Sequence, residues 1–177
     1  MGYSLFDTAI GTCAIAWTDR GIRRVALPDE TPDATRSRMR RHLASAAEQT
    51  PPASVRSVVQ AIVSLLEGTH VDLTDVVLDD DDVPALHRRV YAITRSIAPG
   101  HTLTYGAIAK QLGDARLAQT VGYALGRNPF PIIVPCHRVL AAHGALGGFS
   151  APGGVDTKRR MLEIEGALEA LPADLFS

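Results

Sequence analysis

The sequence predicts an α+β fold in which a small antiparallel sheet with helices precedes a mostly helical half. Three short apolar segments near the N-terminus are separated by turn-forming residues, which is typical of strands. From residue 84 onward, apolar residues recur at helical spacing between short turns. The run Asp79-Asp80-Asp81-Asp82 separates the two patterns. We therefore expect two domains, an N-terminal α/β domain at residues 1–82 and a second domain at 83–177.

The N-terminal half is expected to hold three strands and two helices. The strands are predicted at residues 3–6, 13–17 and 22–27, and a tight turn joins the last two. A basic helical stretch is predicted at 35–48, and a second helix at 53–66 with Gly68 as its stop. Residues 71–78 read as a further strand.

The four aspartates are expected to form a solvated loop, because like charges repel one another. Asp82 is a candidate N-cap for the next helix, with Pro84 in its first turn. The run lacks the glycine and the spaced ligands of a calcium loop, so no cation site is expected there.

The C-terminal half is predicted to be helical, with helices at 84–97, 104–112, 115–126 and 154–166. The second and third are joined by a tight turn at Gly113, which is typical of a helix-turn-helix. The face of the third helix opposite its apolar stripe carries almost no bulky side chains. Such a face suits close approach either to a nucleic-acid groove or to another helix, and both interpretations stay open at this point.

Composition excludes several classes of protein. Of the 177 residues, 46% are hydrophobic and 21% are charged, which is typical of a globular protein rather than a disordered or collagen-like one. No apolar stretch approaches the ~18 residues that span a membrane, and Asp7 interrupts the apolar start, so neither a membrane partner nor a secretory signal is expected. Two cysteines cannot build a disulfide framework, which favours a reduced, cytoplasmic protein.

Charge is unevenly divided along the chain. The net charge is −1, with −5 over residues 1–84 and +4 over residues 85–177. A mildly basic second half could face a polyanion, although the four aspartates alone account for much of the asymmetry.

Cys136 is the candidate nucleophile. It lies in Pro-Cys-His-Arg at 135–138, behind an apolar run at 132–134 that reads as a buried strand. A neighbouring imidazolium or guanidinium lowers the pKa of a thiol and favours the reactive thiolate. Cys13 has no such setting and is expected to pack in the core.

Glu165 is the candidate partner of His137. It follows Met161 by four residues and Leu162 by three, on an apolar stripe that we expect to begin at Val155. A carboxylate on a core-facing stripe needs a partner, and a histidine that acts as a base needs an orienting carboxylate. The alternative is that Glu165 lies at the edge of the stripe, in solvent or beside a cation.

The glycine-rich segment 143–154 is expected to form a lid or a pocket wall near Cys136. It has neither a P-loop nor a GxGxxG pattern after a strand, so no nucleotide cofactor is expected. A metal site built on Cys136, His137 and His143 would have too few ligands at too loose a spacing, and we expect no metal.

Taken together, these motifs make the chain similar to the O6-alkylguanine-DNA alkyltransferases, also called methylated-DNA–protein-cysteine methyltransferases. The resemblance rests on Pro-Cys-His-Arg-Val at 135–139, with Asn128-Pro129 before it and Gly148-Phe149-Ser150 after it. Further support comes from Thr104-Tyr105, from Val121-Gly122, and from Lys158 followed by Glu165-Gly166. The resemblance is strong across residues 84–166 and weaker over 1–78.

The resemblance implies a single-turnover DNA repair reaction and a winged-helix-like C-terminal domain. A monomer would bind double-stranded DNA that contains an alkylated guanine and flip the damaged base into a pocket. The thiolate of Cys136 would then take the alkyl group irreversibly, without a cofactor.

The resemblance also implies a role for each matching residue. The implied catalytic residues are Cys136 as acceptor, His137 as base through a water, Glu165 as its orienting partner and Tyr105 as proton donor. The implied substrate-binding residues are Asn128, Val139 through its backbone, Phe149 and Ser150. The implied DNA-binding residues are Arg116, Ala118, Gln119, Thr120, Gly122 and Tyr123.

One position departs from the family pattern, because Gln119 stands where the family normally has an arginine that fills the gap left by the flipped base. We expect weaker flipping, or a preference for distorted or single-stranded lesions, with Arg116 as a partial substitute. A lesion-recognition or altered-substrate paralogue is therefore kept as the alternative. A Cys-His hydrolase is a third interpretation, but no signature of an oxyanion hole supports it.

Overall fold

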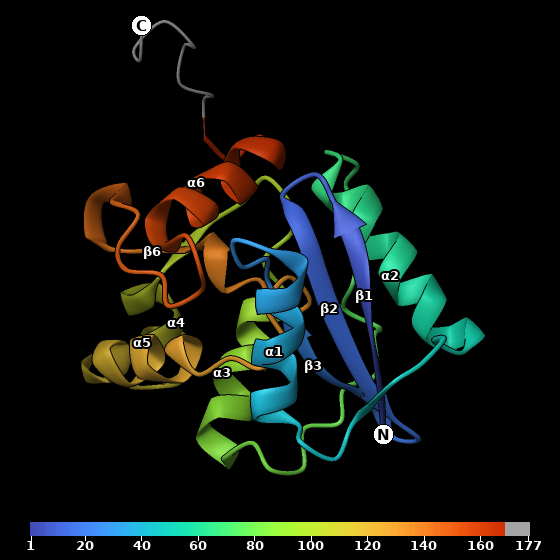
Figure 1. Cartoon of the computed structure of the whole chain (residues 1–177). Helices are drawn as coiled ribbons and strands as arrows, with labels where there is room; N and C mark the ends of the chain where they lie inside the picture. The colour runs from blue at the N-terminus through green and yellow to red at the C-terminus, as the bar shows by residue number, and fades with distance from the viewer. Residues whose placement is uncertain (169–177) are drawn as a thin grey trace, which may run out of the picture.

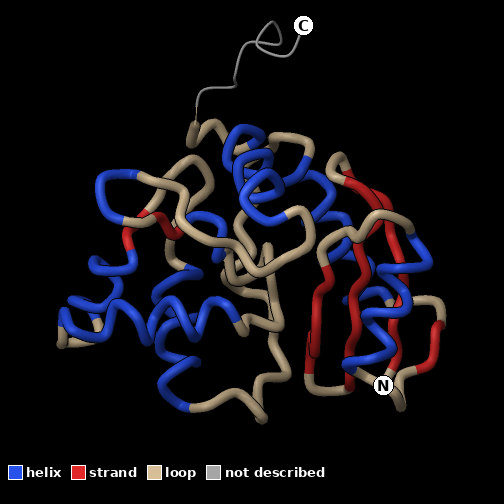
Figure 2. The backbone as a smooth tube through the Cα atoms, turned by 60° about the vertical axis from the view of Figure 1, so that its left-hand side comes forward, coloured by secondary structure: helices blue, strands red, loops and turns tan. Residues whose placement is uncertain are grey.

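The computed structural model describes residues 1–168 and has an α+β architecture (Figure 1). A half that contains the main sheet and a mostly helical half lie side by side (Figure 2). Among the described residues, no helix combines the length and the apolar character needed to cross a membrane. The predicted fold class is confirmed.

A four-stranded sheet organises the N-terminal half. Strands β1 (Gly2–Thr8), β2 (Gly11–Thr18) and β3 (Gly21–Ala26) are antiparallel, and β4 (Ala47–Glu48) pairs in parallel with β1. The strand order is β3-β2-β1-β4, so β3 forms one edge of the sheet. The three predicted strands are confirmed. Successive side chains of β2 point to opposite faces and both faces are buried, so the sheet needs a cover on each side.

Two helices provide these covers. Helix α1 (Pro32–His42) packs Met39 against the alanines of β2, whereas α2 (Ala53–Leu66) packs Ile62 against the face that carries Ile15. The predicted bounds of α2 are confirmed. The helix predicted at 35–48 was wrong at its end, because residues 47–48 leave α1 and hydrogen-bond to the free edge of β1 as β4.

The strand predicted at residues 71–78 was also wrong. The guanidinium of Arg95 donates to the carbonyls of Leu73, Thr74 and Val76 at 2.9, 2.7 and 2.8 Å. These carbonyls are satisfied by a side chain instead of a neighbouring strand, so the segment is an irregular loop. Only Leu78 forms an isolated bridge, with Ile22 of β3.

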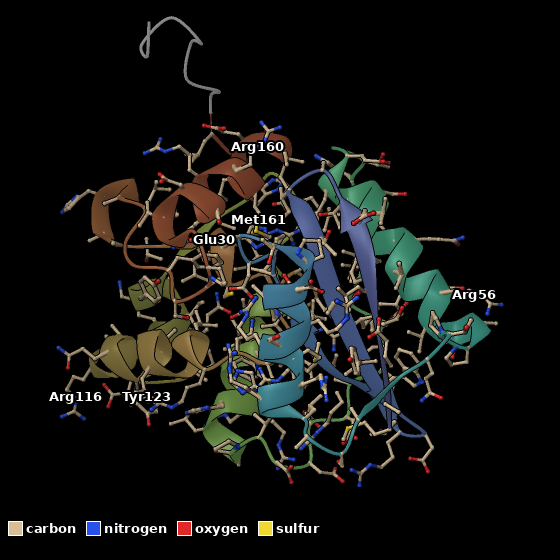
Figure 3. All side chains as sticks on the ribbon, in the orientation of Figure 1. Glu30, Arg56, Arg116, Tyr123, Arg160 and Met161 are labelled. Carbon is tan, nitrogen blue, oxygen red and sulfur yellow. The ribbon has the colours of Figure 1, made fainter. Side chains whose placement is uncertain are left out.

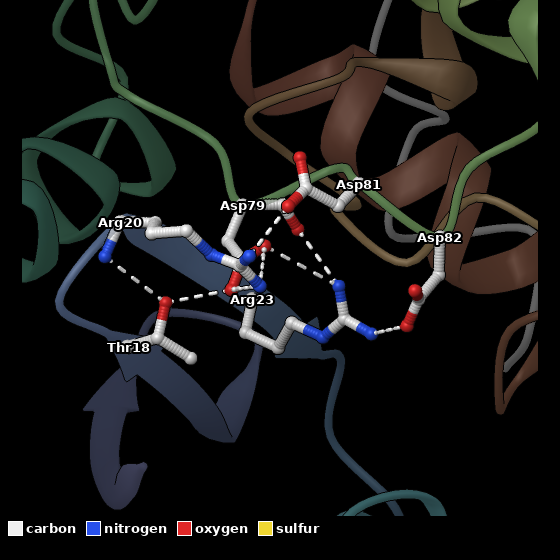
Figure 4. A network of polar contacts seen from close by, with 6 residues as sticks. All are labelled: Thr18, Arg20, Arg23, Asp79, Asp81 and Asp82. Carbon is white, nitrogen blue, oxygen red and sulfur yellow. Dashed lines mark hydrogen bonds and ion pairs between the residues drawn. The ribbon is translucent and has the colours of Figure 1, made fainter.

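The aspartate run is not a freely solvated loop, because its side chains bind the hairpin between β2 and β3 (Figure 4). The buried carboxylate of Asp79 accepts a 2.6 Å hydrogen bond from Thr18 and lies 3.0 Å from the guanidinium of Arg20. Arg23 pairs with both Asp79 and Asp82. The expectation that Asp82 caps the next helix was therefore wrong, and Pro84 occupies the N-cap position without a side-chain hydrogen bond.

The C-terminal half contains α3 (Ala85–Arg95), α4 (Tyr105–Gln111), α5 (Ala118–Gly126) and α6 (Gly154–Ile164). A 3₁₀ turn (Ala115–Leu117) leads into α5, and two short strands, β5 (Leu103–Thr104) and β6 (Val139–Leu140), pair in parallel. Helices α4 and α5 pack on each other and on α3. The predicted helix-turn-helix is confirmed as α4 and α5, and Thr104 caps α4 through the amide of Ala107.

The apolar run at 132–134 is buried, but it is a tight turn and not a strand. The amide of Val134 donates to the carbonyl of Phe130 at 2.8 Å, and Ile132 has a φ of 76°. Pro131 and Pro135, which flank the run, have no backbone N–H groups to donate to a neighbouring strand. In a turn, the remaining amides can bond to carbonyls of the same segment. This turn sets the direction in which Cys136 enters the site.

Candidate active site

Cys136 begins a 3₁₀ turn (Cys136–Arg138) directly after the buried turn, and it is 8% exposed. Burial raises the pKa of its thiol above the usual value. A hydrogen bond from Asn128, the charge of Lys158 and the backbone amides of Cys136 and His137 act in the opposite direction. The resting cysteine is therefore a thiol surrounded by groups that stabilise its thiolate.

Asn128 holds the turn in place. Its side-chain amide donates to the carbonyl of Val134 at 2.8 Å, and its oxygen accepts from the amide of Phe130 at 2.9 Å. The carbonyl of Pro129 accepts from Val25 of β3 at 2.9 Å, so the edge of the sheet is bonded to this segment. Asn128 thus lies beside the active-site turn and bonds to both of its ends.

His137 and Glu165 meet as expected. The Nε2 atom of His137 lies 2.9 Å from Oε1 of Glu165, and both side chains are buried. Burial lowers the pKa of His137, and Glu165 opposes this effect. Burial alone would raise the pKa of Glu165, but hydrogen bonds from His137 and Arg138 lower it to about 2. Within residues 1–168, the Nδ1 atom of His137 has no hydrogen-bond partner, so it is the ring nitrogen free to accept a proton.

The role of Arg138 was missed. Its guanidinium donates to both oxygens of Glu165 at 2.8 and 2.9 Å and to the carbonyl of Ile97 at 2.5 Å. The bidentate pair compensates the buried carboxylate and fixes it against His137. The sequence does not predict this ion pair, because the carboxylate that Arg138 shares with His137 lies 27 residues further along the chain.

Lys158 was the second missed residue, although its position gave a signal. It precedes Met161 by three residues and Leu162 by four, and it is fully buried on the apolar stripe of α6. The stripe begins at Lys158 and not at Val155, which is 38% exposed, so that expectation was wrong. The Nζ atom donates to the carbonyl of Val139 at 2.6 Å, and burial lowers the pKa of Lys158 to about 8.

Tyr105 lies at the start of α4, with its ring 5.8 Å from Nζ of Lys158. Burial and the charge of Cys136 both raise the pKa of its phenol, which keeps the group protonated at neutral pH. A Cβ on Gly122 would lie 3.9 Å from this ring. Gly122 therefore faces Tyr105. The face of α5 that carries small residues is thus not fully exposed to solvent.

A cavity of about 290 Å³ opens onto Cys136 and is lined by both halves of the protein. The C-terminal half contributes Leu125, Gly126, Arg127, Asn128, Pro131, Cys136, Phe149, Ser150 and Ala151. The N-terminal half contributes Arg24, Val25, Leu27, Arg38 and His42. The predicted Phe149 and Ser150 are thus placed at the cavity, and the hydroxyl of Ser150 donates to the carbonyl of Gly126 at 3.0 Å. The contribution of the sheet half was not predicted.

The outer face of α5 presents Gln119 and Tyr123 to solvent, and Tyr123 is 55% exposed. Ala118 and Thr120 are half-buried. Arg116 belongs to the 3₁₀ turn and not to α5, and its guanidinium binds Asp114 at 2.9 Å. Figure 3 shows Arg116 and Tyr123 on the same side of the molecule.

Cys13 lies in the core, as expected, and burial raises the pKa of its thiol to about 12. Within the described part of the chain, no three His, Cys, Asp or Glu side chains lie close enough to hold a metal ion.

A helix-turn-helix beside a buried Cys-His-Glu arrangement defines a class of proteins that combine DNA binding with a thiol nucleophile. Residues 85–167 match the family model for the 6-O-methylguanine DNA methyltransferase, DNA binding domain. A methylated-DNA–protein-cysteine methyltransferase of Mycobacterium tuberculosis is 33% identical over 174 residues, which cover 98% of this chain and 96% of the relative. One from Methanothermobacter thermautotrophicus is 39% identical over 119 residues, which cover 67% of this chain and 65% of that relative.

Solved structures agree with these matches. The crystal structure of Mycobacterium tuberculosis OGT in complex with DNA has a TM-score of 0.75 and 30% identity, and the match covers 94% of each chain. The O6-methylguanine-DNA methyltransferase of Pyrococcus kodakaraensis has a TM-score of 0.74 and 27% identity, covering 93% of this chain and 99% of that one. The chain belongs to the methylated-DNA–protein-cysteine methyltransferase family, whose members act in DNA repair.

Proposed function

We propose that this protein repairs O6-alkylguanine in DNA by moving the alkyl group irreversibly to Cys136. The sulfur–carbon bond forms as the bond between the alkyl carbon and O6 breaks, and the electron pair passes to the guanine. The observation that supports this most is the position of Cys136, which opens onto a cavity and adjoins the buried His137–Glu165 pair. The thiolate of a thioether is a poor leaving group, so in this proposal one protein molecule repairs one lesion.

The proposal assigns proton transfer to His137 and Tyr105. The Nδ1 atom of His137 takes the thiol proton through a water, while Glu165 holds Nε2 and stabilises the imidazolium. Tyr105, which is protonated at neutral pH, donates to the guanine ring as the leaving group gains charge. The proton lost by the thiol is balanced by the proton that guanine gains. Val139 would accept from the guanine amino group through its carbonyl, which Lys158 already contacts.

DNA binding is proposed for the α4–α5 helix-turn-helix of a monomer acting in the cytoplasm. The side chains of α5 that point outward would contact the groove, and Gln119 would enter the space left by the flipped base. Unstacking a base costs a few kcal/mol and is easiest at a mispaired lesion. Because Gln119 has no charge, we propose that flipping from an intact duplex is slow. We also propose residues 1–82 and 83–177 as the two domains.

The second candidate function is lesion recognition, or transfer from a specialised substrate. It is favoured by Gln119, which stands where the family normally has an intercalating arginine. It is opposed by the intact Cys136 and its surroundings, since a pure sensor needs no thiolate-stabilising groups.

Intact-protein mass spectrometry after mixing with an O6-methylguanine duplex tests the proposal. We expect the protein to gain ~14 Da, with a stoichiometry of one, because a methyl group replaces the thiol hydrogen. Cys136→Ala should gain nothing, whereas the matched variant Cys13→Ala should still react. A protein that binds the lesion without any mass gain would favour the sensor, and continued turnover would favour a hydrolase.

A further inference from the structure

A second cavity, of about 460 Å³, adjoins the cavity at Cys136. It lies where β3, the end of α1, α3 and the end of α5 meet (Figure 1), and its lining includes Arg23, Arg24, His42, His87, Tyr123 and Arg127. Three of these residues, Arg24, His42 and Arg127, also line the cavity at Cys136 and therefore lie between the two. The reaction proposed above fills only the first cavity and leaves the second without a ligand.

The boundary between the two cavities is positively charged, and the charge of Arg24 is not compensated. The carboxylates of the second cavity are already paired, because Asp79 and Asp82 both bind Arg23. Within residues 1–168, by contrast, the side chain of Arg24 makes neither a hydrogen bond nor an ion pair, although it is only partly exposed. Burial lowers the pKa of Arg24, and the charges of Arg38 and Arg23 lower it further. Holding an unpaired cation there costs stability, which an incoming anion would recover.

Beside this boundary, the second cavity offers a surface on which a base can stack. Tyr123 is 55% exposed, and the guanidinium of Arg127 lies 3.8 Å from the centre of its ring. The ring of His87 lies 5.9 Å from that of Tyr123, at an angle of 71°. Tyr123 covers one face of the guanidinium, and the other face stays open because Arg127 is exposed. Unpaired bases stack on guanidinium planes and aromatic rings of this kind.

Two cavities with a cation between them match the chemistry of two consecutive nucleotides, since one phosphodiester with one negative charge joins their bases. With the damaged guanine in the cavity at Cys136, the phosphate beside it can lie against Arg24 while the next base enters the second cavity. In an intact duplex that next base stays paired and stacked, so only an unpaired or distorted strand can deliver it. An anion without a base would use the cation but not the rings.

We infer that the second cavity is a nucleotide subsite, which holds the nucleotide adjacent to the lesion when the strand is unpaired. Arg24 pairs with the linking phosphate, and the neighbouring base stacks on Arg127 beside Tyr123. This inference rests on the proposed function, because the lesion in the first cavity positions the strand. The subsite gives unpaired lesions a contact that lesions in an intact duplex lack, which suits a chain that presents the uncharged Gln119 to the DNA stack.

Single-turnover transfer from short single strands with a central O6-methylguanine tests the inference. One neighbour of the lesion is changed at a time, either by removing its base or by replacing its linking phosphate with a neutral methylphosphonate. On one side of the lesion, each change should raise the strand concentration that gives half the maximal rate by about 10-fold, as for loss of a stacked base or of a hydrogen bond to a charged group. The maximal rate should not change, because the reacting groups are untouched. The same changes on the other side should have no effect.

Two variants connect these effects to residues. Arg24→Met should weaken binding of the unmodified strand by about 10-fold but leave binding of the methylphosphonate strand unchanged. Arg127→Met should have the same relation to the strand with the abasic neighbour. A folding defect would weaken binding of every strand, so the loss of each effect on its matched strand identifies the contact. On an O6-methylguanine duplex, Arg127→Met should change the rate by less than about 3-fold, because the neighbouring base stays in the helix.

Arg88→Met is the matched control, because Arg88 is exposed on α3 next to His87 and lines neither cavity. It should bind all strands as the wild type does. The inference is overturned if changes on both sides of the lesion have no effect, or if Arg24→Met weakens the unmodified and methylphosphonate strands equally. It is equally overturned if the wild type takes methyl from duplex but not from single strands, and each of these results leaves the proposed function standing. A wild type that takes methyl from neither overturns the proposed function and the inference together.

Discussion

The carboxylate of Glu165 is shared by two buried partners, His137 and Arg138, and this sharing makes it the residue on which the site depends. It accepts from the guanidinium at 2.8 and 2.9 Å and lies 2.9 Å from the imidazole. Removing one member of a buried charge network leaves the other charge uncompensated, which costs more than the network itself contributes.

We therefore expect Glu165→Gln to lower the free energy of unfolding by about 3–5 kcal/mol, because Arg138 loses its counter-charge. Alkyl transfer should also slow by about 10²-fold, since His137 loses its orienting partner. Urea denaturation and single-turnover kinetics measure the two effects. Glu163→Gln, two residues earlier and only half-buried, serves as the control. Unchanged kinetics in Glu165→Gln would remove Glu165 from the proposed mechanism.

Lys158 gives a prediction about pH. Its pKa is about 8, and its positive charge favours the thiolate of Cys136. As pH rises through 8, Lys158 loses this charge and the pKa of Cys136 rises, so the transfer rate should climb up to about pH 8 and level off above it. Lys158→Met should be about 10-fold slower at pH 7, as expected for a lost charge interaction, and its profile should have no break near pH 8.

The check is a single-turnover pH profile of each protein, with Arg160→Met as control. Arg160 is an exposed cation on the same helix (Figure 3), and its loss should leave the break in place. A Lys158→Met profile that keeps its break near pH 8 would show that another group titrates there.

At the scale of elements, periodic segments could be predicted from the sequence and non-periodic ones could not. Helix α2 and the α4–α5 pair follow directly from apolar spacing and from the proline and glycine residues that bound them, because these are local signals. For residues 132–134 the sequence predicts a strand, since it shows an apolar run but not that Ile132 adopts a positive φ. A β-branched residue seldom does so, and here the surrounding packing imposes it.

The residues of the candidate site likewise differ in whether a local sequence signal identifies them. Cys136, His137 and Glu165 could be predicted because motif and helical spacing place them. Arg24 could not, because only the tertiary bond between Val25 and Pro129 brings β3 to the cavity.

The exposed face of helix α5 leads to a prediction about DNA binding. Gln119 is exposed on its outer face, at the position expected to enter the DNA stack. Gln119→Arg should raise the transfer rate on duplex DNA by about 10-fold while leaving single-stranded DNA nearly unchanged, because a cation adds attraction to the orphan base and phosphates. Rates on matched duplex and single-stranded oligonucleotides measure this.

Arg116→Gln is the companion variant. Arg116 is already paired with Asp114, so its loss should change the duplex rate by less than about 3-fold, as for a screened surface ion pair. If Gln119→Arg repairs duplex no faster than the wild type, position 119 does not limit flipping.

At the scale of the whole molecule, the β2–β3 hairpin binds both the active-site turn and the acidic run that precedes α3. The edge of β3 bonds to Pro129, and Asp79, in the segment that leads to α3, binds Thr18, Arg20 and Arg23 (Figure 4). Composition suggested a boundary at this acidic run, but the side chains bind the run to the sheet. We therefore expect the two halves to unfold together.

Asp79→Asn tests this coupling. We expect the free energy of unfolding to fall by about 1–3 kcal/mol, as for hydrogen bonds to a buried charged group, while far-UV circular dichroism and tyrosine fluorescence still report a single urea transition. Asp81→Asn, whose partner Arg20 is well exposed, should cost less than about 1 kcal/mol. Two separated transitions in the wild-type protein would show instead that the halves are independent.

Asp79→Asn also tests how the free energy of unfolding depends on pH. Burial alone would raise the pKa of Asp79, but the hydrogen bonds from Thr18 and Arg20 and the charges of both arginines lower it. A carboxyl whose pKa is lower in the folded state stabilises the fold above its ordinary pKa of ~3.9, and this contribution is lost as pH falls toward the folded value. The stability difference between wild type and Asp79→Asn should thus be constant above about pH 5 and shrink below pH ~4. A difference that stayed constant down to pH 3 would mean that Asp79 contributes through packing and not through its charge, and urea midpoints measured from pH 3 to 7 separate the two.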